Sequence, residues 1–305
     1  MHGGAGWAPP AEEAAASETQ VRAALAAALA AGHGVLAAGG SALDAVVAAV
    51  RVLEDCEWLN AGRGSVLGAT GRVEMDAAVM DGASRRAGAV AGLRGVVNPV
   101  LAARAVMERT PHVLLAGDGA EQFARDQGLA RAAPESFVTE LRRRQLAAWR
   151  ERSAADPGPA GPRQAGGGTV GAVARDARGH LAAATSTGGL TGKLPGRVSD
   201  SALIGAGTFA DDATCAVSAT GTGDAFIRAG FAHQVDALLR HAGLDLEEAC
   251  QRALAGARAL GGSGGCIALD AAGRAALPFD TEWMARGRIG PDGGPRVALR
   301  RGEQL

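Results

Sequence analysis

Three consecutive glycines at positions 166–168 lead directly into Thr169 and an apolar run. The segment before them, 151–165, is rich in proline, glycine and charged residues and has little capacity to fold. On this local pattern alone, the glycines end a linker that enters a β-strand. The alternative is a self-cleavage site. Cutting the bond between Gly168 and Thr169 would leave Thr169 with a free α-amine beside its hydroxyl, the base and the nucleophile of an N-terminal threonine hydrolase.

The composition indicates a globular protein. Hydrophobic residues make up 47% of the chain, enough for one large core or two small ones, and the formal net charge is −1 with arginines dispersed along the sequence. A nucleic-acid partner is therefore not expected. No window has the apolar length of a membrane span, and the N-terminus lacks the pattern of a signal peptide. We therefore expect a cytoplasmic protein that does not contact membranes.

The cysteines and glycines give no sign of a cofactor needed for catalysis. Cys56, Cys215, Cys250 and Cys266 are widely spaced and form no CxxC pair, which is typical of free thiols and not of zinc ligands or disulfides. The glycine-rich stretches lack the spacing of a nucleotide-binding fingerprint.

The periodicity of the chain predicts grouped helices and hairpins. Two helices open the chain, over 17–31 with Ser17 as N-cap and a stop at residues 32–34, and over 41–55 with Ser41 and Asp44 in a capping box. Further helices are predicted over 98–108, 119–127, 134–151, 224–240 and 246–260, and hairpins over 73–92, 169–185 and 264–278. Because helices do not alternate singly with strands, we expect an α+β fold of two mainly antiparallel sheets, stacked face to face with helices outside.

Small hydroxyl residues gather where predicted strands end. Thr220 and Gly221 lie between a strand and a helix, where a hydroxyl and a backbone N–H could stabilise an oxyanion. The ordinary alternative is a strand-to-helix turn with Thr222 as N-cap. Arg197 and Asp200 could hold the α-carboxylate and the α-ammonium of an amino acid, although a surface salt bridge would give the same pattern.

Taken together and in order, these motifs resemble the plant-type asparaginase and isoaspartyl peptidase family of N-terminal nucleophile hydrolases. The resemblance spans nearly the whole chain. Its motifs are the HGGAG of residues 2–6, LNAG of 59–62, MDG of 80–82, NPVLAAR of 98–104, GTVG of 168–171, TSTGG of 185–189, GRVSDS of 196–201, GAG of 205–207, TGTGD of 220–224 and LGGSGG of 260–265.

The resemblance implies a single domain over residues 1–305, built as a four-layer αββα sandwich. It also implies self-cleavage into an α-subunit, 1–168, and a β-subunit, 169–305, with 151–168 as a flexible linker. Thr169 would be the nucleophile and its α-amine the general base. Assigned roles for the other residues follow in chain order: Asn60 close to the nucleophile, Thr187 bonded to it, Arg197 and Asp200 on the substrate's carboxylate and ammonium, Thr220 and Gly221 in the oxyanion hole, and Gly223 lining the pocket.

The resemblance also implies a structural sodium or potassium ion and a dimer of αβ units. The cation would be bound by backbone carbonyls of the 53–63 loop, with the candidates Leu53, Glu54, Cys56, Leu59, Ala61 and Arg63. The substrate would be L-asparagine or a β-aspartyl dipeptide. Two alternatives stay open, a glycosylasparaginase-like amidase and a member that is neither processed nor catalytic and only binds.

One departure from the family pattern concerns the first residues. Family members usually carry a short apolar strand before the HGGAG motif, whereas this sequence starts at Met1. Either the start site is misassigned, or ladder groups of a buried sheet are left unpaired at a cost in stability.

Overall fold

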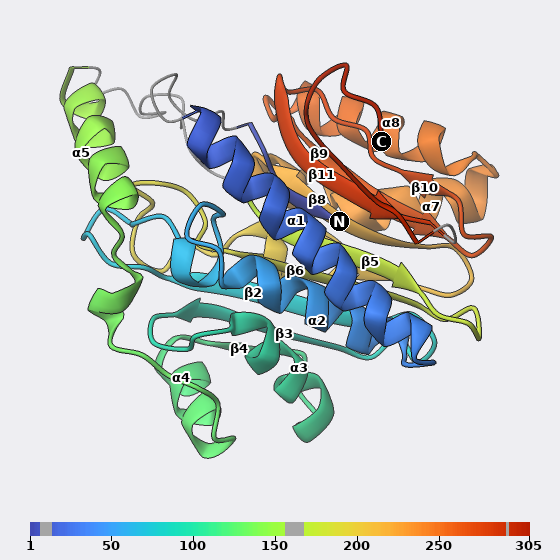
Figure 1. Ribbon diagram of the computed structural model, residues 1–305, viewed down its shortest axis with the longest axis horizontal. Coiled ribbons are helices and arrows are strands. Elements are labelled where there is room, and N and C mark those ends of the chain that lie inside the picture. The colour runs from blue at the N-terminus through green and yellow to red at the C-terminus, as the bar shows by residue number, and fades with distance from the viewer. Residues whose placement is uncertain (7–13, 156–167, 291–292) are drawn as a thin grey trace.

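Two β-sheets form the fold in the computed structural model, which describes residues 1–6, 14–155, 168–290 and 293–305 (Figure 1). The larger sheet has the order β12-β11-β1-β5-β6-β2-β3-β4. Its strands are β1 (His2–Ala5), β2 (Met75–Asp81), β3 (Ala87–Leu93), β4 (Leu114–Ala116), β5 (Val170–Arg175), β6 (Leu181–Thr187), β11 (Trp283–Ile289) and β12 (Pro295–Arg300). The smaller sheet has the order β10-β9-β8-β7 and consists of β7 (Thr208–Ala210), β8 (Cys215–Gly221), β9 (Gly264–Asp270) and β10 (Ala275–Ala276).

The helices cover the outer faces of the two sheets. They are α1 (Ala14–Ala37), α2 (Ala42–Glu54), α3 (Pro99–Arg109), α4 (Gly117–Asp126), α5 (Glu140–Ala155), α6 (Gly223–Ala229), α7 (Phe231–Ala242) and α8 (Leu246–Ala259). Helices α1, α2 and α3 pack on the larger sheet, and α7 and α8 pack on the smaller one, while β5 and β6 contact β8 across the gap between the sheets. The predicted α+β sandwich with helices outside is therefore confirmed. All described strand pairs are antiparallel except β3 with β4.

The central strands are buried on both faces. Every residue of β6 is buried, and so are all residues of β2 up to Met80. Helices cover one face of these strands and the smaller sheet covers the other, so alternation between apolar and polar residues is not needed. Polar side chains on these strands, such as Thr185 and Thr187, therefore point into the protein and must find partners there.

Helix α1 corrects two expectations from the sequence. It begins before Ser17, which is not its N-cap, and it continues through Gly32 and Gly34 to Ala37. Gly32 permits close packing of the helices α1 and α2, since a Cβ at this position would lie 3.1 Å from the carbonyl oxygen of Ala45. The glycine therefore serves helix packing and does not end the helix.

Helix α1 also corrects the expectation about membrane spans. Its segment Ser17–Ala37 is long and apolar enough to cross a membrane by length and composition. In the fold, the helix lies across the larger sheet and packs against α2, β11 and β12, with Leu25 fully buried (Figure 1). This packing is that of a helix covering a sheet in a globular domain.

Other predictions are mostly confirmed. Ser41 caps α2 by accepting a hydrogen bond from the backbone N–H of Asp44, as the capping box predicted. The predicted linker is wrong at its start, since residues 151–155 belong to α5, and residues 156–167 lie outside the described residues. Two predicted helices are divided. In 134–151, Pro134–Phe137 forms a separate 3-10 helix before α5, and in 224–240, Gly230 with its positive φ separates α6 from α7.

Strand β1 lies inside the larger sheet, between β11 and β5. Its residues pair with Arg286, Ala285 and Met284 of β11, and His2 also pairs with Gly171 of β5. The HGGA motif is thus itself a central strand. It brings the first residues of the chain against the residue that follows Val170.

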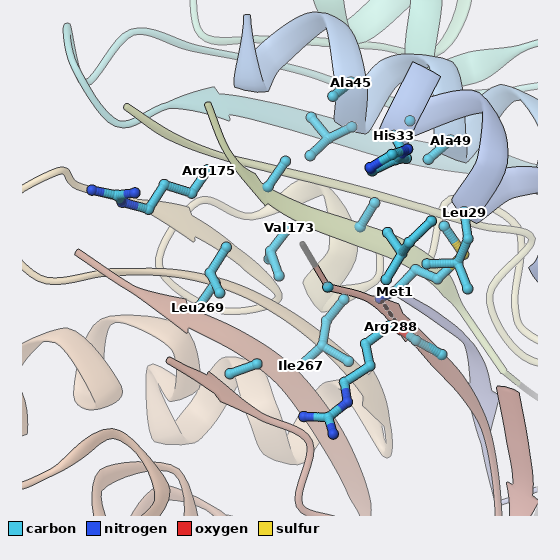
Figure 2. Close-up of a pocket in the computed structure, with 18 of the residues that line it drawn as sticks. Met1, Leu29, His33, Ala45, Ala49, Val173, Arg175, Ile267, Leu269 and Arg288 are labelled. Atoms are coloured by element: carbon cyan, nitrogen blue, oxygen red, sulfur yellow. Dashed lines mark hydrogen bonds between the residues drawn. The ribbon is translucent and has the colours of Figure 1, made fainter. Parts of the chain in front are cut away.

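The strands on either side of β1, β5 and β11, border a cavity of about 760 Å³ next to Met1 (Figure 2). In the described part of the chain, residues 172–175 pair only with β6, and residues 288–289 only with β12. The α-ammonium of Met1 donates a hydrogen bond to the carbonyl oxygen of Gly287 at 2.7 Å, and burial lowers its pKa to about 5.

Candidate active site

Thr169 and Thr187 lie opposite each other at adjacent ends of β5 and β6. The antiparallel register pairs Val170 with Ser186, which places the residue before β5 beside the last residue of β6. The hydroxyl of Thr169 donates a hydrogen bond to the hydroxyl oxygen of Thr187 at 3.2 Å, and both side chains are buried. A hydroxyl at the start of one strand is thus held by a hydroxyl at the end of its neighbour.

Two side chains converge on the carbonyl oxygen of Gly168. The amide Nδ2 of Asn60 donates to it at 2.7 Å, and the hydroxyl of Thr187 donates to it at 3.1 Å. Asn60 is itself fixed, because Nδ2 also donates to the carbonyl of Gly189 and Oδ1 accepts from the N–H of Val66. Donors that meet on one carbonyl oxygen polarise it and can stabilise a negative charge there.

The backbone conformation at Gly168 and the space at Gly4 both favour glycine. Gly168 has a φ of +123°, a conformation that L side chains rarely adopt. A Cβ on Gly4, in β1, would lie 2.8 Å from the Cα of Gly168. The HGGA strand therefore packs directly on the peptide before Thr169, and a side chain at Gly4 would displace that peptide.

Arg197, Asp200 and Gly223 form a second cluster. A Cβ on Gly223 would lie 2.4 Å from Oδ1 of Asp200 and 3.1 Å from a guanidinium nitrogen of Arg197, so the absence of a side chain opens space beside both charges. Arg197 donates to the carboxylate of Asp224 at 2.7 Å, so the surface salt bridge between Arg197 and Asp200 that the sequence allowed is not formed. Asp224 was not predicted to take part.

Both charged groups of this cluster keep unused bonding capacity. Oδ2 of Asp200 and Nε of Arg197 are buried, and neither has a hydrogen-bond partner among the described residues. Burial raises the pKa of Asp200 to about 7, against the opposing effect of the Arg197 cation. Buried polar atoms without partners are costly and rare in native proteins, so this pair is suited to receive the charged groups of a ligand.

Asp76 connects the two clusters. It faces Thr187 in the register of β2 and β6, and its Oδ2 accepts the N–H of Ser199, next to Asp200, at 2.8 Å. No residue role was predicted for Asp76. Its only signal in the sequence is a carboxylate followed by four apolar residues of the same strand.

Thr220 and Gly221 lie at the end of β8, close to β1 in space. The hydroxyl of Thr220 accepts the N–H of Ala5 at 3.0 Å, which leaves its proton available to donate. Gly221 has a φ of +143° and sits against the carbonyl oxygen of Ser263. In the part of the chain that the structure describes, no hydrogen bond joins Thr220 or Gly221 to Thr169. The alternative N-cap role of Thr222 lacks its side-chain bond.

The loop after α2 offers carbonyl oxygens to a cation. The carbonyl oxygens of Leu59, Cys56 and Glu57 lie 2.0, 2.7 and 2.7 Å from the point that a Cβ on Gly64 would occupy. This cradle of carbonyl oxygens offers the donor type that a hard cation such as sodium prefers. Cys56 and Leu59 were among the predicted ligands, whereas Glu57 was not. The other candidates, Leu53, Glu54, Ala61 and Arg63, lie in the same loop or at its borders.

The comparison with protein families shows to which family the chain belongs. The family model described as asparaginase matches residues 1–299. The chain belongs to the asparaginase family. The family resemblance and the enzyme interpretation of the sequence are therefore confirmed.

Known members of the asparaginase family are similar to this chain over most of their length. An isoaspartyl peptidase from Escherichia coli (strain K12) is 52% identical over 291 residues, which cover 94% of this chain and 90% of the relative. An isoaspartyl peptidase/L-asparaginase from Mus musculus is 44% identical over 269 residues, covering 87% and 78%. A probable isoaspartyl peptidase/L-asparaginase 2 from Arabidopsis thaliana is 40% identical over 322 residues, covering 98% and 97%.

Proposed function

We propose that this asparaginase-family enzyme hydrolyses L-asparagine to L-aspartate and ammonia and cleaves β-aspartyl dipeptides, with Thr169 as an N-terminal nucleophile. The observation that carries the proposal is the convergence of Asn60 and Thr187 on the carbonyl of Gly168, with the hydroxyl of Thr169 bonded to Thr187. A hydroxyl, a proton path and a polarised carbonyl are the requirements for cutting the bond before Thr169.

Self-cleavage is proposed to begin with attack by Thr169 on the carbonyl carbon of Gly168. As the new C–O bond forms, the proton of the Thr169 hydroxyl passes to Thr187, and the proton of Thr187 passes to the Gly168 oxygen. Collapse breaks the C–N bond, and the proton on the Gly168 oxygen passes to the leaving nitrogen, so that an ester carbonyl and the free α-amine form together. Water then hydrolyses the ester between Gly168 and Thr169. The products are the α-subunit, 1–168, and the β-subunit, 169–305.

In turnover, the free α-amine of Thr169 is the general base for its own hydroxyl. An α-amine has a pKa of about 8, so a useful fraction is neutral near pH 7. The hydroxyl attacks the side-chain amide of the substrate, and the amine passes the proton to the leaving nitrogen. The oxyanion is assigned to the hydroxyl of Thr220 and the N–H of Gly221, and water then releases aspartate from the acyl-enzyme.

The cluster of charges at Arg197 and Asp200 is assigned to the substrate's amino-acid end. Arg197 would bind the α-carboxylate and Asp200 the α-ammonium, with Gly223 leaving space for them. Their buried atoms without partners support this assignment. Because both substrates share the aspartyl half, the same contacts serve L-asparagine and β-aspartyl dipeptides.

The remaining proposals concern the setting of the enzyme. The 53–63 loop would hold a structural sodium or potassium ion through its carbonyl oxygens, without a part in the chemistry. Catalysis itself would need no cofactor. We further propose a cytoplasmic dimer of αβ units that binds neither nucleic acid nor membrane.

The test is a denaturing gel of the purified protein together with an assay for ammonia release from L-asparagine. Two bands, with the second beginning at Thr169 by mass spectrometry, and loss of both cleavage and turnover in Thr169→Ala, are expected. A single persistent band that Thr169→Ala does not change would leave only a binding role. Comparison of L-asparagine, β-Asp-Leu and a glycosylated asparagine as substrates separates the aspartyl hydrolase from a deglycosylating amidase.

A further inference from the structure

A chain of buried polar side chains runs from Thr169 into the space between the two sheets. Nδ1 of His2 lies 2.7 Å from the carbonyl oxygen of Thr169, and Nε2 of His2 lies 2.8 Å from the hydroxyl of Ser218. The hydroxyl of Ser218 lies 2.8 Å from that of Thr185, which accepts from Thr208 at 2.7 Å. All four side chains have no exposed surface.

The chain crosses between the sheets at each step. His2 and Thr185 belong to the larger sheet, and Ser218 and Thr208 belong to the smaller one. The contact between His2 and Ser218 requires glycine at position 171 of β5. A Cβ on Gly171 would lie 2.0 Å from the hydroxyl of Ser218 and 2.5 Å from Nε2 of His2. A buried polar chain of this kind is costly unless every member is satisfied.

Counting protons fixes the direction of every bond near His2. The Thr169 carbonyl can only accept, so Nδ1 must carry a proton. A neutral imidazole then has a bare Nε2, which must accept the proton of Ser218. The hydroxyl of Ser218 must in turn accept from Thr185. The neutral imidazole is consistent with a pKa lowered to about 3, chiefly by burial and then by the Met1 ammonium.

The far end of the chain reaches the substrate-binding cluster. Thr208 lies 3.0 Å from the carbonyl oxygen of Ser201, the residue after Asp200. Because the proton of Thr185 goes to Ser218, the single proton of Thr208 goes to Thr185, and the Ser201 carbonyl lies beside it. The polar chain therefore spans the distance from the nucleophile to the segment that carries Asp200.

We propose that His2 is a positioning residue for Thr169, and that Ser218, supported by Thr185 and Thr208, holds its imidazole in the Nδ1-protonated tautomer that this role requires. The proposal rests on the proposed role of Thr169 as the N-terminal nucleophile. Cleavage would remove the restraint that Gly168 places on Thr169, and the first residue of a chain frays unless it is tied down. The bond from His2 to the Thr169 carbonyl then holds the residue that carries both the nucleophile and its base.

This role predicts a specific imbalance between two rates. Before cleavage, Asn60 and Thr187 also hold Thr169 in place through the peptide that precedes it. After cleavage, the position of Thr169 depends more strongly on its bond to His2. Ser218→Ala is therefore expected to lower kcat of the processed enzyme about ten- to a hundredfold, while KM and the rate of self-cleavage change less. A residue that only packs the core would not separate these quantities.

The decisive experiment is a double-mutant cycle between His2 and Ser218. In His2→Asn, the amide Nδ2 can donate to the Thr169 carbonyl in place of Nδ1, and an amide has no tautomer to be fixed. Ser218→Ala should therefore lower kcat by a much smaller factor in the His2→Asn background than in the wild type. Thr214→Val, which removes a buried hydroxyl bonded to Asp236 outside the chain, is the matched control and should leave kcat unchanged.

Each outcome decides the proposal. Equal losses from Ser218→Ala in both backgrounds, or an unchanged kcat, would overturn it while leaving the proposed function intact. A wild type that neither cleaves itself nor releases ammonia would overturn the function and this role together. If Ser218→Ala does not fold, Ser218→Cys, which keeps a weak donor, and Thr185→Val provide the test. The first should retain more of kcat than the second, and the reverse order would contradict the proposal.

Discussion

Asn60 donates its side-chain amide to the carbonyl oxygen of Gly168 at 2.7 Å, although the two residues lie 108 positions apart in the chain. The second proton of the same amide is bound by the carbonyl of Gly189. Asn60 thus cannot turn away from Gly168 without losing both bonds. Its position makes the loop after α2 part of the apparatus that would cut the chain.

Asn60→Ala is expected to slow self-cleavage about 10²- to 10³-fold, because it removes a donor that would stabilise the negative charge developing on the Gly168 oxygen during attack. The measurement is the half-time of appearance of the fragment beginning at Thr169. Asn98→Ala is the matched control, since Asn98 is also a buried asparagine but donates to Asp55. Cleavage of Asn60→Ala at the rate of the control would contradict the assignment.

The KM for L-asparagine is expected to rise as pH falls from about 8 to 6. Burial raises the pKa of Asp200 to about 7, so at lower pH the carboxyl takes up a proton and no longer attracts the substrate's ammonium. Profiles of KM against pH for the wild type and Asp200→Asn provide the check. The variant should have a higher KM that does not vary over this range. A sloping profile in Asp200→Asn would assign the titration to another group.

Asp200→Asn is expected to stabilise the protein in alkaline buffer while it impairs activity. The carboxyl has a pKa near 3.8 when unfolded and about 7 when folded. Between these values the folded state binds the extra proton, so this group lowers the free energy of unfolding as pH rises through that window. The difference in Tm between Asp200→Asn and the wild type should be near zero at about pH 4 and reach a few degrees at about pH 8. A difference independent of pH would contradict this linkage.

Gly64→Ala is expected to lower Tm and to weaken its dependence on sodium. A Cβ there would lie 2.0 Å from the carbonyl oxygen of Leu59 and would occupy the oxygen cradle. Tm is measured in buffers containing sodium, potassium or only choline. Gly34→Ala is the control, because no atom lies within 4 Å of its added Cβ, and the helix should gain about 0.5–1 kcal/mol. A wild-type Tm that is the same in all three buffers would argue against the cation.

Val173→Leu is expected to raise the free energy of unfolding by about 0.5–1 kcal/mol, because Val173 lines the large cavity beside Met1 (Figure 2). Val217→Leu makes the same change in a fully buried site of β8 and should destabilise by about 1–3 kcal/mol through overpacking. Chemical denaturation measures both. Equal destabilisation by the two variants would mean that the cavity cannot accept an added methylene.

Local signals in the sequence predicted the local parts of the fold. The capping box at Ser41 and the turn between β5 and β6 depend on neighbouring residues and were predicted correctly. The length of α1 was missed, because Gly32 resembles a helix stop until the approach of Ala45 is known. Helix propensity depends on the residues of one segment, whereas the presence of this glycine is explained by the neighbouring helix that packs against it.

The same distinction holds in the active site. Thr169 and Arg197 could be singled out because their residue types and neighbours suggest chemistry. The link from His2 to Ser218 could not, since 216 positions separate them and only the stacking of the sheets brings them together. Backbone carbonyl oxygens, such as those in the loop near Gly64, are present in every residue. A site made of them therefore gives no recognisable pattern in the sequence.

The position of β1 between β11 and β5 has a consequence for how an active enzyme can be made. The two products of cleavage would share one sheet, with a strand of the first inserted between two strands of the second. If the two subunits were synthesised as separate chains, each would expose unpaired strand edges, which are prone to aggregation, until the subunits associated. A single precursor chain would avoid this exposure, because the bond before Thr169 would be cut only after the strands of both subunits had paired in one sheet.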